Sequence, residues 1–258
     1  RHLTLAEQLV LSVLWLGINA QSAALLPIVI PLQIVLFVPA GSVGNAQQAT
    51  FLGWFSAGGA LVTLIVPPVI GALSDRTTSV FGRRRPYIVA GALILLLADW
   101  ELATAKDVIG FTLAFLLSQV AINIAIAAYQ GFVPDRVSES QRGAASGYLG
   151  LMTILGNVGS LALASLIFSN VNLDAPAQVS QGAIVTGSYA FYAITAIIFA
   201  LTTAVTLFGV PETPLTAASP TLPASGSGAL AAQVRWRGWL SPWIDPWKSR
   251  NFVWVFLT

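Results

Sequence analysis

Long apolar stretches without charge dominate the chain and alternate with short charged segments. No Asp, Glu, Lys or Arg occurs in residues 8–74, 108–134, 143–173 or 175–211, stretches of 67, 27, 31 and 37 residues. About 20 helical residues cross the hydrocarbon core of a bilayer. Each stretch therefore has room for a membrane-spanning helix, and the first has room for two.

Apolar runs bounded by breakers predict an all-α membrane protein with six transmembrane helices in one bundle, residues 1–210. The predicted spans are 5–38, 49–73, 86–104, 108–133, 143–168 and 188–210. Pro27 and Pro31 lack backbone donors, so we expect a kink in the second half of the first span. In the fifth span, closely spaced glycines predict tight helix packing: Gly143, Gly147, Gly150, Gly156 and Gly159.

A linker and the start of another span follow the bundle. Residues 211–250 begin with a segment dense in Pro, Ser and Gly, which cannot continue a helix. The linker then places Trp236, Trp239, Trp243 and Trp247 three or four residues apart, which indicates anchoring at the headgroups or a docking segment. Residues 251–258 read as the start of a seventh span. Because the chain opens on Arg1, we also expect upstream residues.

The distribution of basic residues predicts the orientation. With the N-terminus in the cytoplasm, Lys106 alone lies outside, and the inner segments carry 11 of the 12 basic residues. These are Arg1, Arg76, Arg83, Arg84, Arg85, Arg136, Arg142, Arg235, Arg237, Lys248 and Arg250. The positive-inside rule therefore supports six spans with both ends cytoplasmic. We expect an integral protein of a plasma membrane, the inner membrane of a bacterium.

Composition agrees with lipid as the solvent and excludes several classes of function. Apolar residues make up 56 % and charged residues 9 % of the chain, whereas soluble domains carry about 25 % charged residues. Cysteine is absent and His2 is the only histidine, which removes thiolate chemistry and imidazole-based metal sites or triads. We therefore expect no enzyme, metal or cofactor, and a net charge of +2 gives no reason to expect nucleic acid.

The loop after the second span carries a signature. Residues 71–86 read GALSDRTTSVFGRRRP. Asp75 offers a carboxylate to an arginine or a helix N-terminus, and Gly82 permits a tight turn before three guanidinium groups. An ordinary positive-inside loop would explain the arginines but neither Asp75 nor the glycines. We interpret the loop as a charged latch, formed by Gly71, Asp75, Arg76, Gly82, Arg83 and Arg84.

This loop resembles the hallmark of the major facilitator superfamily, and its SDRTTSVFGRRRPYI version is most similar to sucrose-proton symporters and related glycoside transporters. Asp135 within Pro-Asp-Arg, and Arg142 within Gln-Arg-Gly, resemble the superfamily's loop between spans four and five. The resemblance implies a twelve-span transporter of two six-helix halves with alternating access. It also implies that Asp75 helps to lock the cytoplasmic side against a second half, of which this chain is the N-terminal counterpart.

Polar side chains near the middle of the spans suggest a solute site. The amides are Asn19, Gln21, Gln119, Asn123 and Asn157, and Trp54 and Tyr192 could add rings. Gln119 and Asn123 share a helical face as an i, i+4 pair. Amides with aromatic planes suit a neutral polyhydroxylated ligand, because each hydroxyl both donates and accepts. The alternative is that the amides only join helix to helix.

Coupling to an ion requires a group that binds it. Asp99 and Glu101, in the third span, are the candidate coupling residues, although both could simply lie at the interface. The sucrose symporters carry an acid near the position of Gln119 and an Arg near Gln130, and this chain has neither. Four possibilities stay open: coupling by a proton through Asp99, coupling by sodium, coupling through a residue of the second half, and no coupling.

Two functions fit the pattern. The first is a secondary active transporter of a small polar solute, a sugar or glycoside, of which this chain is one half. The second is a non-transporting transmembrane subunit or assembly factor that uses the same scaffold in a larger complex. A membrane enzyme lacks a nucleophile, a metal cluster and paired carboxylates.

Overall fold

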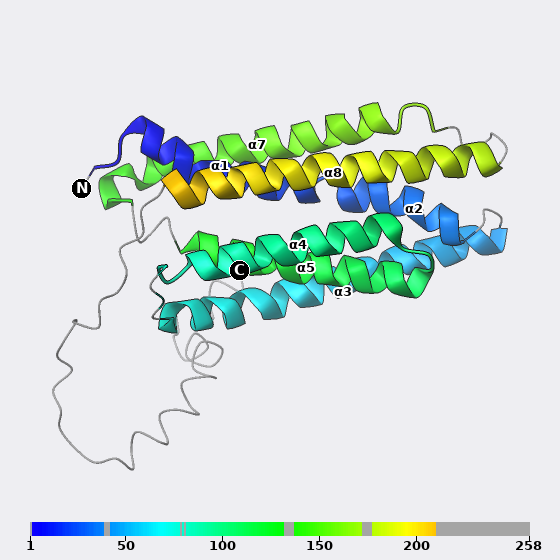
Figure 1. The fold of residues 1–258 in the computed structure, drawn as a ribbon, viewed down its shortest axis with the longest axis horizontal. Helices are drawn as coiled ribbons and strands as arrows, with labels where there is room; N and C mark the ends of the chain where they lie inside the picture. The colour runs from blue at the N-terminus through cyan, green and yellow to red at the C-terminus, as the bar shows by residue number, and fades with distance from the viewer. Residues whose placement is uncertain are drawn as a thin grey trace, which may run out of the picture. The chain divides into compact units, whose positions relative to one another are not determined.

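Six membrane-length helical runs form the described part of the chain. The computed structural model describes residues 2–38, 42–77, 79, 81–131, 137–171 and 177–209, and no strand occurs among them. The candidate spans are Leu5–Phe37, Gly44–Asp75, Arg85–Thr104, Val108–Gln130, Glu139–Ile167 and Ser180–Gly209. They run along one axis (Figure 1). The predicted all-α bundle is confirmed, whereas residues 211–250 and 251–258 lie outside the described residues.

The first span is an interrupted helix. It consists of α1 (Leu5–Ser22), a π-helical segment (Leu25–Val29) and α2 (Ile30–Phe37). Pro27 lacks an N–H and its ring crowds the carbonyl four residues earlier, so the regular α-helical pattern cannot continue through it. The N–H of Val29 instead bonds the oxygen of Ala24, five residues back, at 3.1 Å. Proline thus interrupts the span in its second half, in the form of a π turn.

The other spans are continuous helices: α3 (Ser42–Arg76), α4 (Arg85–Thr104), α5 (Val108–Gln130), α7 (Arg142–Ile167) and α8 (Ala177–Gly209). Local signals explain where several begin. Thr4 and Glu7 form a capping box at the start of α1. Asp107 caps α5 by accepting a hydrogen bond from the N–H of Gly110 at 2.8 Å.

Two helices begin well before the predicted spans. Helix α3 starts at residue 42 and not 49, and α8 starts at residue 177 and not 188. The added segments contain neither a charge nor a proline, but their Asn, Gln, Ser and Thr side chains make them less apolar than the rest of each helix. Apolar patterning therefore located the most apolar part of each helix but not its extension.

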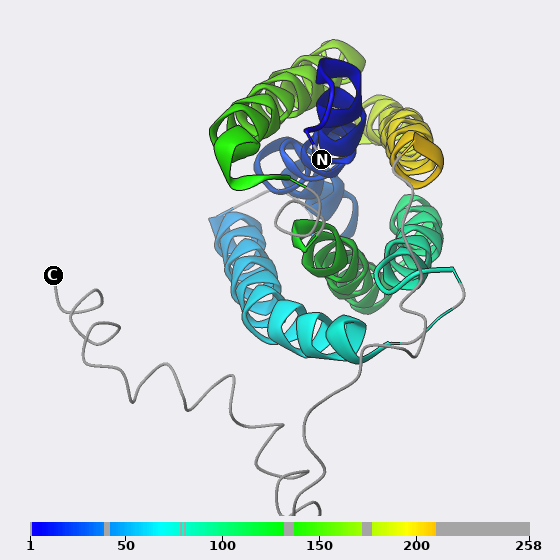
Figure 2. The same cartoon turned by 90° about the vertical axis from the view of Figure 1, so that its left-hand side faces the viewer.

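The helices lie in the order α3, α5, α4, α8, α1 and α7 around the bundle, as the end-on view shows (Figure 2). Helix α1 packs on α7 and α8, and α5 packs on α3 and α4. Spans one to three (α1 with α2, α3 and α4) and spans four to six (α5, α7 and α8) are two sets of three. The first helix of each set thus packs on the second and third helices of the other set. We call the end with Arg83 and Arg84 the arginine end and the end with Lys106 the lysine end.

Small residues set the closest helix approaches. A Cβ on Gly156 of α7 would lie 2.7 Å from the oxygen of Leu16 in α1, and one on Gly91 of α4 would lie 2.8 Å from the oxygen of Ala121 in α5. Gly156, Ser160 and Ala164 recur at intervals of four and are all buried. The N–H of Ala24 donates to the hydroxyl of Ser160 at 3.2 Å. This stripe of small residues lets α7 dock on α1.

The other glycines predicted to pack in the fifth span do not do so in the described structure. A Cβ added to any of them would meet no atom within 4 Å: Gly143, Gly147, Gly150 and Gly159. The reason is rotational, because only the face through Gly156 turns toward α1. The open glycines belong to a helix of which only 17 % of the most apolar stretch is buried.

Helices α3 and α7 are the least buried spans. Only 6 % of the most apolar stretch of α3 is buried, against 39–44 % in the spans of α1, α4, α5 and α8. Large apolar side chains such as Leu61 and Leu64 of α3 and Ile154 and Val158 of α7 are about 60 % exposed. Lipid or further protein must therefore cover these faces.

Candidate functional site

A buried carboxyl–amide pair joins α1 to α4. Asp99 and Gln21 are 3 % and 1 % exposed, and the Nε2 of Gln21 donates to the Oδ1 of Asp99 at 2.7 Å. The other oxygens of the pair, Oδ2 of Asp99 and Oε1 of Gln21, are buried, and no described group hydrogen-bonds either one. Buried polar atoms in proteins are normally hydrogen-bonded. This pair is therefore incomplete as a hydrogen-bonding unit.

A second buried link lies one helical turn further along α4. Gln33 of α2 donates from Nε2 to the oxygen of Leu102 at 3.2 Å and accepts from the hydroxyl of Tyr192 at 2.6 Å. Gln33 and Tyr192 are both buried. Together with the Asp99–Gln21 pair they form a polar cluster between α1, α2, α4 and α8, which we call the Asp99 cluster (Gln21, Gln33, Asp99 and Tyr192).

Amide and hydroxyl groups also line the contact between α3 and α5. The Nδ2 of Asn123 donates to the Oγ1 of Thr63 at 3.3 Å and to the oxygen of Gln119 at 2.8 Å. The carboxamide of Gln119 lies beside Gly59 of α3. Gln119 is half-buried, and its carboxamide makes no hydrogen bond within the described part of the chain. These residues form the α3–α5 polar face (Thr63, Gln119 and Asn123).

The remaining predicted solute residues lie on other surfaces. Asn19 is half-buried and donates from Nδ2 to the oxygen of Trp15 in its own helix at 2.7 Å. Its Cβ lies against Gly156, and Asn157 follows directly in α7. Trp54 of α3 is 70 % exposed. Of the two candidate coupling acids, Glu101 is exposed and Asp99 is buried.

The seven predicted solute residues therefore do not form one group. Gln21 and Tyr192 belong to the interior Asp99 cluster, whereas Gln119 and Asn123 lie between α3 and α5. Gln33 and Thr63 were missed by the sequence reasoning. A glutamine within the apolar first span was a signal for Gln33, but nothing distinguished Thr63 from the other threonines of the spans.

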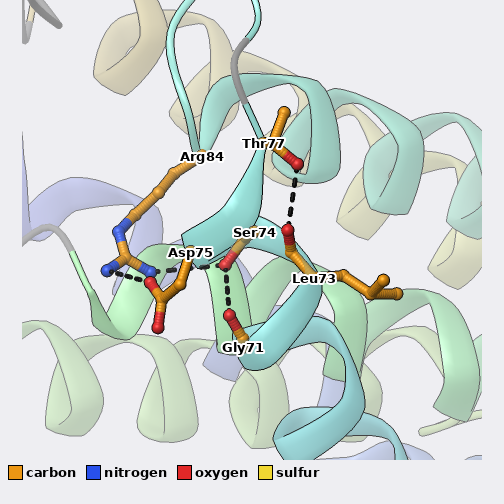
Figure 3. Close-up of polar contacts among 6 residues, drawn as sticks. All are labelled: Gly71, Leu73, Ser74, Asp75, Thr77 and Arg84. Atoms are coloured by element: carbon orange, nitrogen blue, oxygen red, sulfur yellow. Dashed lines mark hydrogen bonds and ion pairs between the residues drawn. The ribbon is translucent and has the colours of Figure 1, made fainter. Parts of the chain in front are cut away.

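The loop at the arginine end is tied by an ion pair. The Nη2 of Arg84 donates to the Oδ1 of Asp75 at 3.1 Å, and its Nη1 lies 3.5 Å from the hydroxyl of Ser74 (Figure 3). Ser74 in turn donates to the oxygen of Gly71 at 3.0 Å. The figure shows Arg84 reaching back to the end of α3. The latch residues Asp75 and Arg84 thus bind each other.

Arg84 also contacts the end of α5. A Cβ on Gly131 would lie 1.8 Å from the Cζ of Arg84, so the guanidinium occupies the space beside this glycine. Arg84 is 7 % exposed. Gly82 has a φ of 101°, which places it in the left-handed region that favours glycine and turns the chain toward Arg84. Asp75 and Arg84 therefore connect α3, the loop and α5.

The other predicted loop residues take part to different degrees. A Cβ on Gly71 would meet no atom within 4 Å. Arg83 is half-buried and is engaged in an interaction of its own. Arg142 lies 3.9 Å from Glu139 across a surface pair. The side chain of Arg76 and all of Asp135 lie outside the described residues.

The described residues contain no group of three or more acids or histidines that could hold a metal ion. Six membrane-length helices with polar side chains buried between them define the chain as an integral membrane protein of the helical multi-span class. A family model described as Major Facilitator Superfamily matches residues 11–258, and the chain belongs to this superfamily of transporters. The resemblance seen in the loop is thereby confirmed.

Several proteins similar to this chain are named as sugar permeases or sugar transporters. The chain is 28 % identical to the general alpha-glucoside permease of Schizosaccharomyces pombe over 151 residues, 51 % of this chain and 27 % of the permease. It is 32 % identical to sucrose transport protein SUC4 of Arabidopsis thaliana over 125 residues, 42 % and 24 % of the two chains. It is 29 % identical to proton-associated sugar transporter A of Rattus norvegicus over 187 residues, 67 % and 24 %. The matches span about a quarter of each relative's length.

Proposed function

We propose that this chain is the N-terminal half of a secondary active transporter that carries a sugar or glycoside by alternating access. The α3–α5 polar face carries the proposal. Gln119 offers a carboxamide that no described group hydrogen-bonds, and Asn123 holds the same face of α5 against Thr63. An amide that both donates and accepts suits a neutral polyhydroxylated solute. The names of the relatives, which refer to glucosides, sucrose and sugar, agree with this class.

The exposed faces of α3 and α7 support a second six-helix half. Both helices leave large apolar side chains uncovered, and α7 adds glycines with open space beside them. Small residues allow close approach of a neighbouring helix. We propose that the second half belongs to the same polypeptide and closes over the α3–α5 polar face.

We expect the two ends of the bundle to face opposite sides of the membrane, with the arginine end in the cytoplasm. Phe81 and Lys106 are exposed near the two ends, and the chain has no cysteine. In right-side-out vesicles, a membrane-impermeant thiol reagent should label Lys106→Cys at once and Phe81→Cys only after permeabilisation. Labelling of both from one side would contradict the six-span topology. The bacterial plasma membrane stays a prediction.

Gln119→Ala is expected to weaken solute binding about tenfold, because the hydrogen bond that the solute loses in a dry site is worth about 1.4 kcal/mol. Full-length protein would first be screened with sugars by thermal shift, at two pH values and with or without sodium. Thr112→Val on the same helix is the control, since its hydroxyl only bonds the oxygen of Val108.

Unchanged affinity in Asn123→Ala and in Gln119→Ala would assign both amides to helix packing. A folded full-length protein that binds and moves no sugar would favour the non-transporting subunit.

A further inference from the structure

The Asp99–Gln21 pair leaves two buried oxygen atoms without a hydrogen-bond donor. Two of its four polar atoms are matched, since Nε2 of Gln21 donates to Oδ1 of Asp99 at 2.7 Å. The other two, Oδ2 of Asp99 and Oε1 of Gln21, are both acceptors when the carboxyl is ionised. Both are buried without a partner in the described structure. A buried acceptor is normally hydrogen-bonded, so each of these two oxygens needs a donor.

We propose that Asp99 is the proton-binding residue of this chain, with Gln21 as its hydrogen-bond partner. A proton on Oδ2 makes the carboxyl a donor, and Oδ2–H can then bond Oε1 of Gln21 while Nε2 keeps its bond to Oδ1. The result is a reciprocal carboxyl–amide pair in which one proton satisfies both unmatched oxygens. This inference rests on the proposed transporter, because only a carrier uses such a proton for coupling.

The charged groups around Asp99 agree with a proton as the neutralising partner. On α4, Arg85 lies 14 residues away, about 21 Å along the helix, and Glu101 is exposed. The packed helices α2 and α5 hold no Asp, Glu, Lys, Arg or His, and α1 holds only Glu7, in its capping box. Helix α8 turns one titratable side chain toward Asp99, the Tyr192 hydroxyl, which is bonded to Gln33. These helices therefore offer Asp99 no cation within reach.

The donor set fits a proton better than a metal ion. Sodium or another hard cation needs about six oxygen ligands. The pair offers two unmatched oxygens, and the described residues contain no group of three or more acids or histidines that could hold a metal ion. A proton needs one acceptor to bind and one to receive its hydrogen bond, which is what Oδ2 and Oε1 supply.

The proposed cycle moves one proton with the solute. A hydronium ion on one side of the membrane gives a proton to Oδ2: one O–H bond of the hydronium breaks to leave water, and an O–H bond forms on Oδ2 as the pair with Gln21 closes. When the carrier opens to the other side, this O–H bond breaks and the proton passes to water there. No oxidant or further reactant is needed.

The test uses the full-length protein and the substitutions Asp99→Asn and Glu101→Gln. Asparagine has the shape of a protonated aspartate and can form both bonds with Gln21, so Asp99→Asn should fold. Infrared spectra recorded against pH report the carbonyl stretch of protonated carboxyl groups. We expect wild type and Glu101→Gln to show a buried, titrating band that Asp99→Asn has lost completely. A band of full amplitude in Asp99→Asn would overturn the proposal.

Transport supplies a second, separate readout. In proteoliposomes with an imposed pH gradient, wild type and Glu101→Gln should accumulate sucrose or maltose, and Asp99→Asn should reach only equilibration. Accumulation by Asp99→Asn at the wild-type level would also overturn the proposal. If wild type moves neither sugar, the proposed solute class fails, while the infrared band still decides whether Asp99 binds a proton.

Discussion

Replacing Gly156 by valine is expected to destabilise the full-length protein by about 3 kcal/mol, because overpacking a tight contact forces backbone shifts. The first added carbon would lie 2.7 Å from the oxygen of Leu16 and 3.1 Å from the amide nitrogen of Ala20. These are backbone atoms of α1, which cannot rotate away as a side-chain tip can. Separating α7 from α1 would also strain the hydrogen bond from Ala24 to Ser160. Thermal unfolding in detergent would measure the loss.

Gly182→Val is the matched control for this change. Gly182 lies in α8 and is exposed, and its added carbon would meet no atom within 4 Å. The two variants share the same cost of placing a β-branched residue in a helix. Equal unfolding temperatures for the two variants would show that the α1–α7 contact does not require a glycine at position 156.

Substituting Asp75 by asparagine is expected to slow solute uptake about tenfold, equivalent to about 1.4 kcal/mol in the barrier, without loss of membrane insertion. The change removes the carboxylate that Arg84 binds at 3.1 Å. Because the side chain of Asp75 is 58 % exposed, the pair should add at most about 1 kcal/mol to stability. Initial uptake rates per amount of inserted protein would separate the two effects.

Gly131→Val tests the same latch from α5. Its added carbon would overlap the guanidinium of Arg84 and displace it from Asp75 without touching either charge. We expect the same slow uptake as in Asp75→Asn. Phe81→Ala is the control, because this loop side chain is 74 % exposed. Wild-type rates in both latch variants would remove the loop from the transport cycle.

The six spans could be predicted because lipid imposes a simple rule on sequence. A helix that crosses it needs a long, mainly apolar stretch, and the arginines collect where the helices emerge. The latch could be predicted in part, since Asp75 and the arginines stand out in a short loop. The contact of Arg84 with Gly131 could not be predicted, because glycine is common at the ends of helices whatever lies beside it.

The partners of the polar side chains inside the bundle could not be predicted from the sequence. The depth of a residue in the membrane does not say toward which neighbouring helix its side chain points. Asn19 and Gln21 lie at similar depth, but two residues on a helix point about 200° apart. Asn19 therefore meets α7 at Gly156 while Gln21 meets α4 at Asp99. That angle was calculable from the numbering alone. Which helix lies on each side of α1 could not be calculated, since it depends on the order in which the helices pack around the bundle.

The π turn in the first span sets the phase of the two glutamines that flank it. Gln21 and Gln33 are 12 residues apart, so a regular α-helix would point them about 120° away from each other. A π turn bonds residue i to i−5 and holds more residues per turn, so everything after it lags in rotation. Both glutamines then reach the same helix, at Asp99 and Leu102. A single-residue deletion within Leu25–Val29 would let this segment close as a regular α-helix, with the two glutamines 11 residues and about 20° apart, so that both would still face α4. Straightening the turn without a deletion would instead turn Gln33 away from Leu102 of α4, even though every side chain of the Asp99 cluster remained.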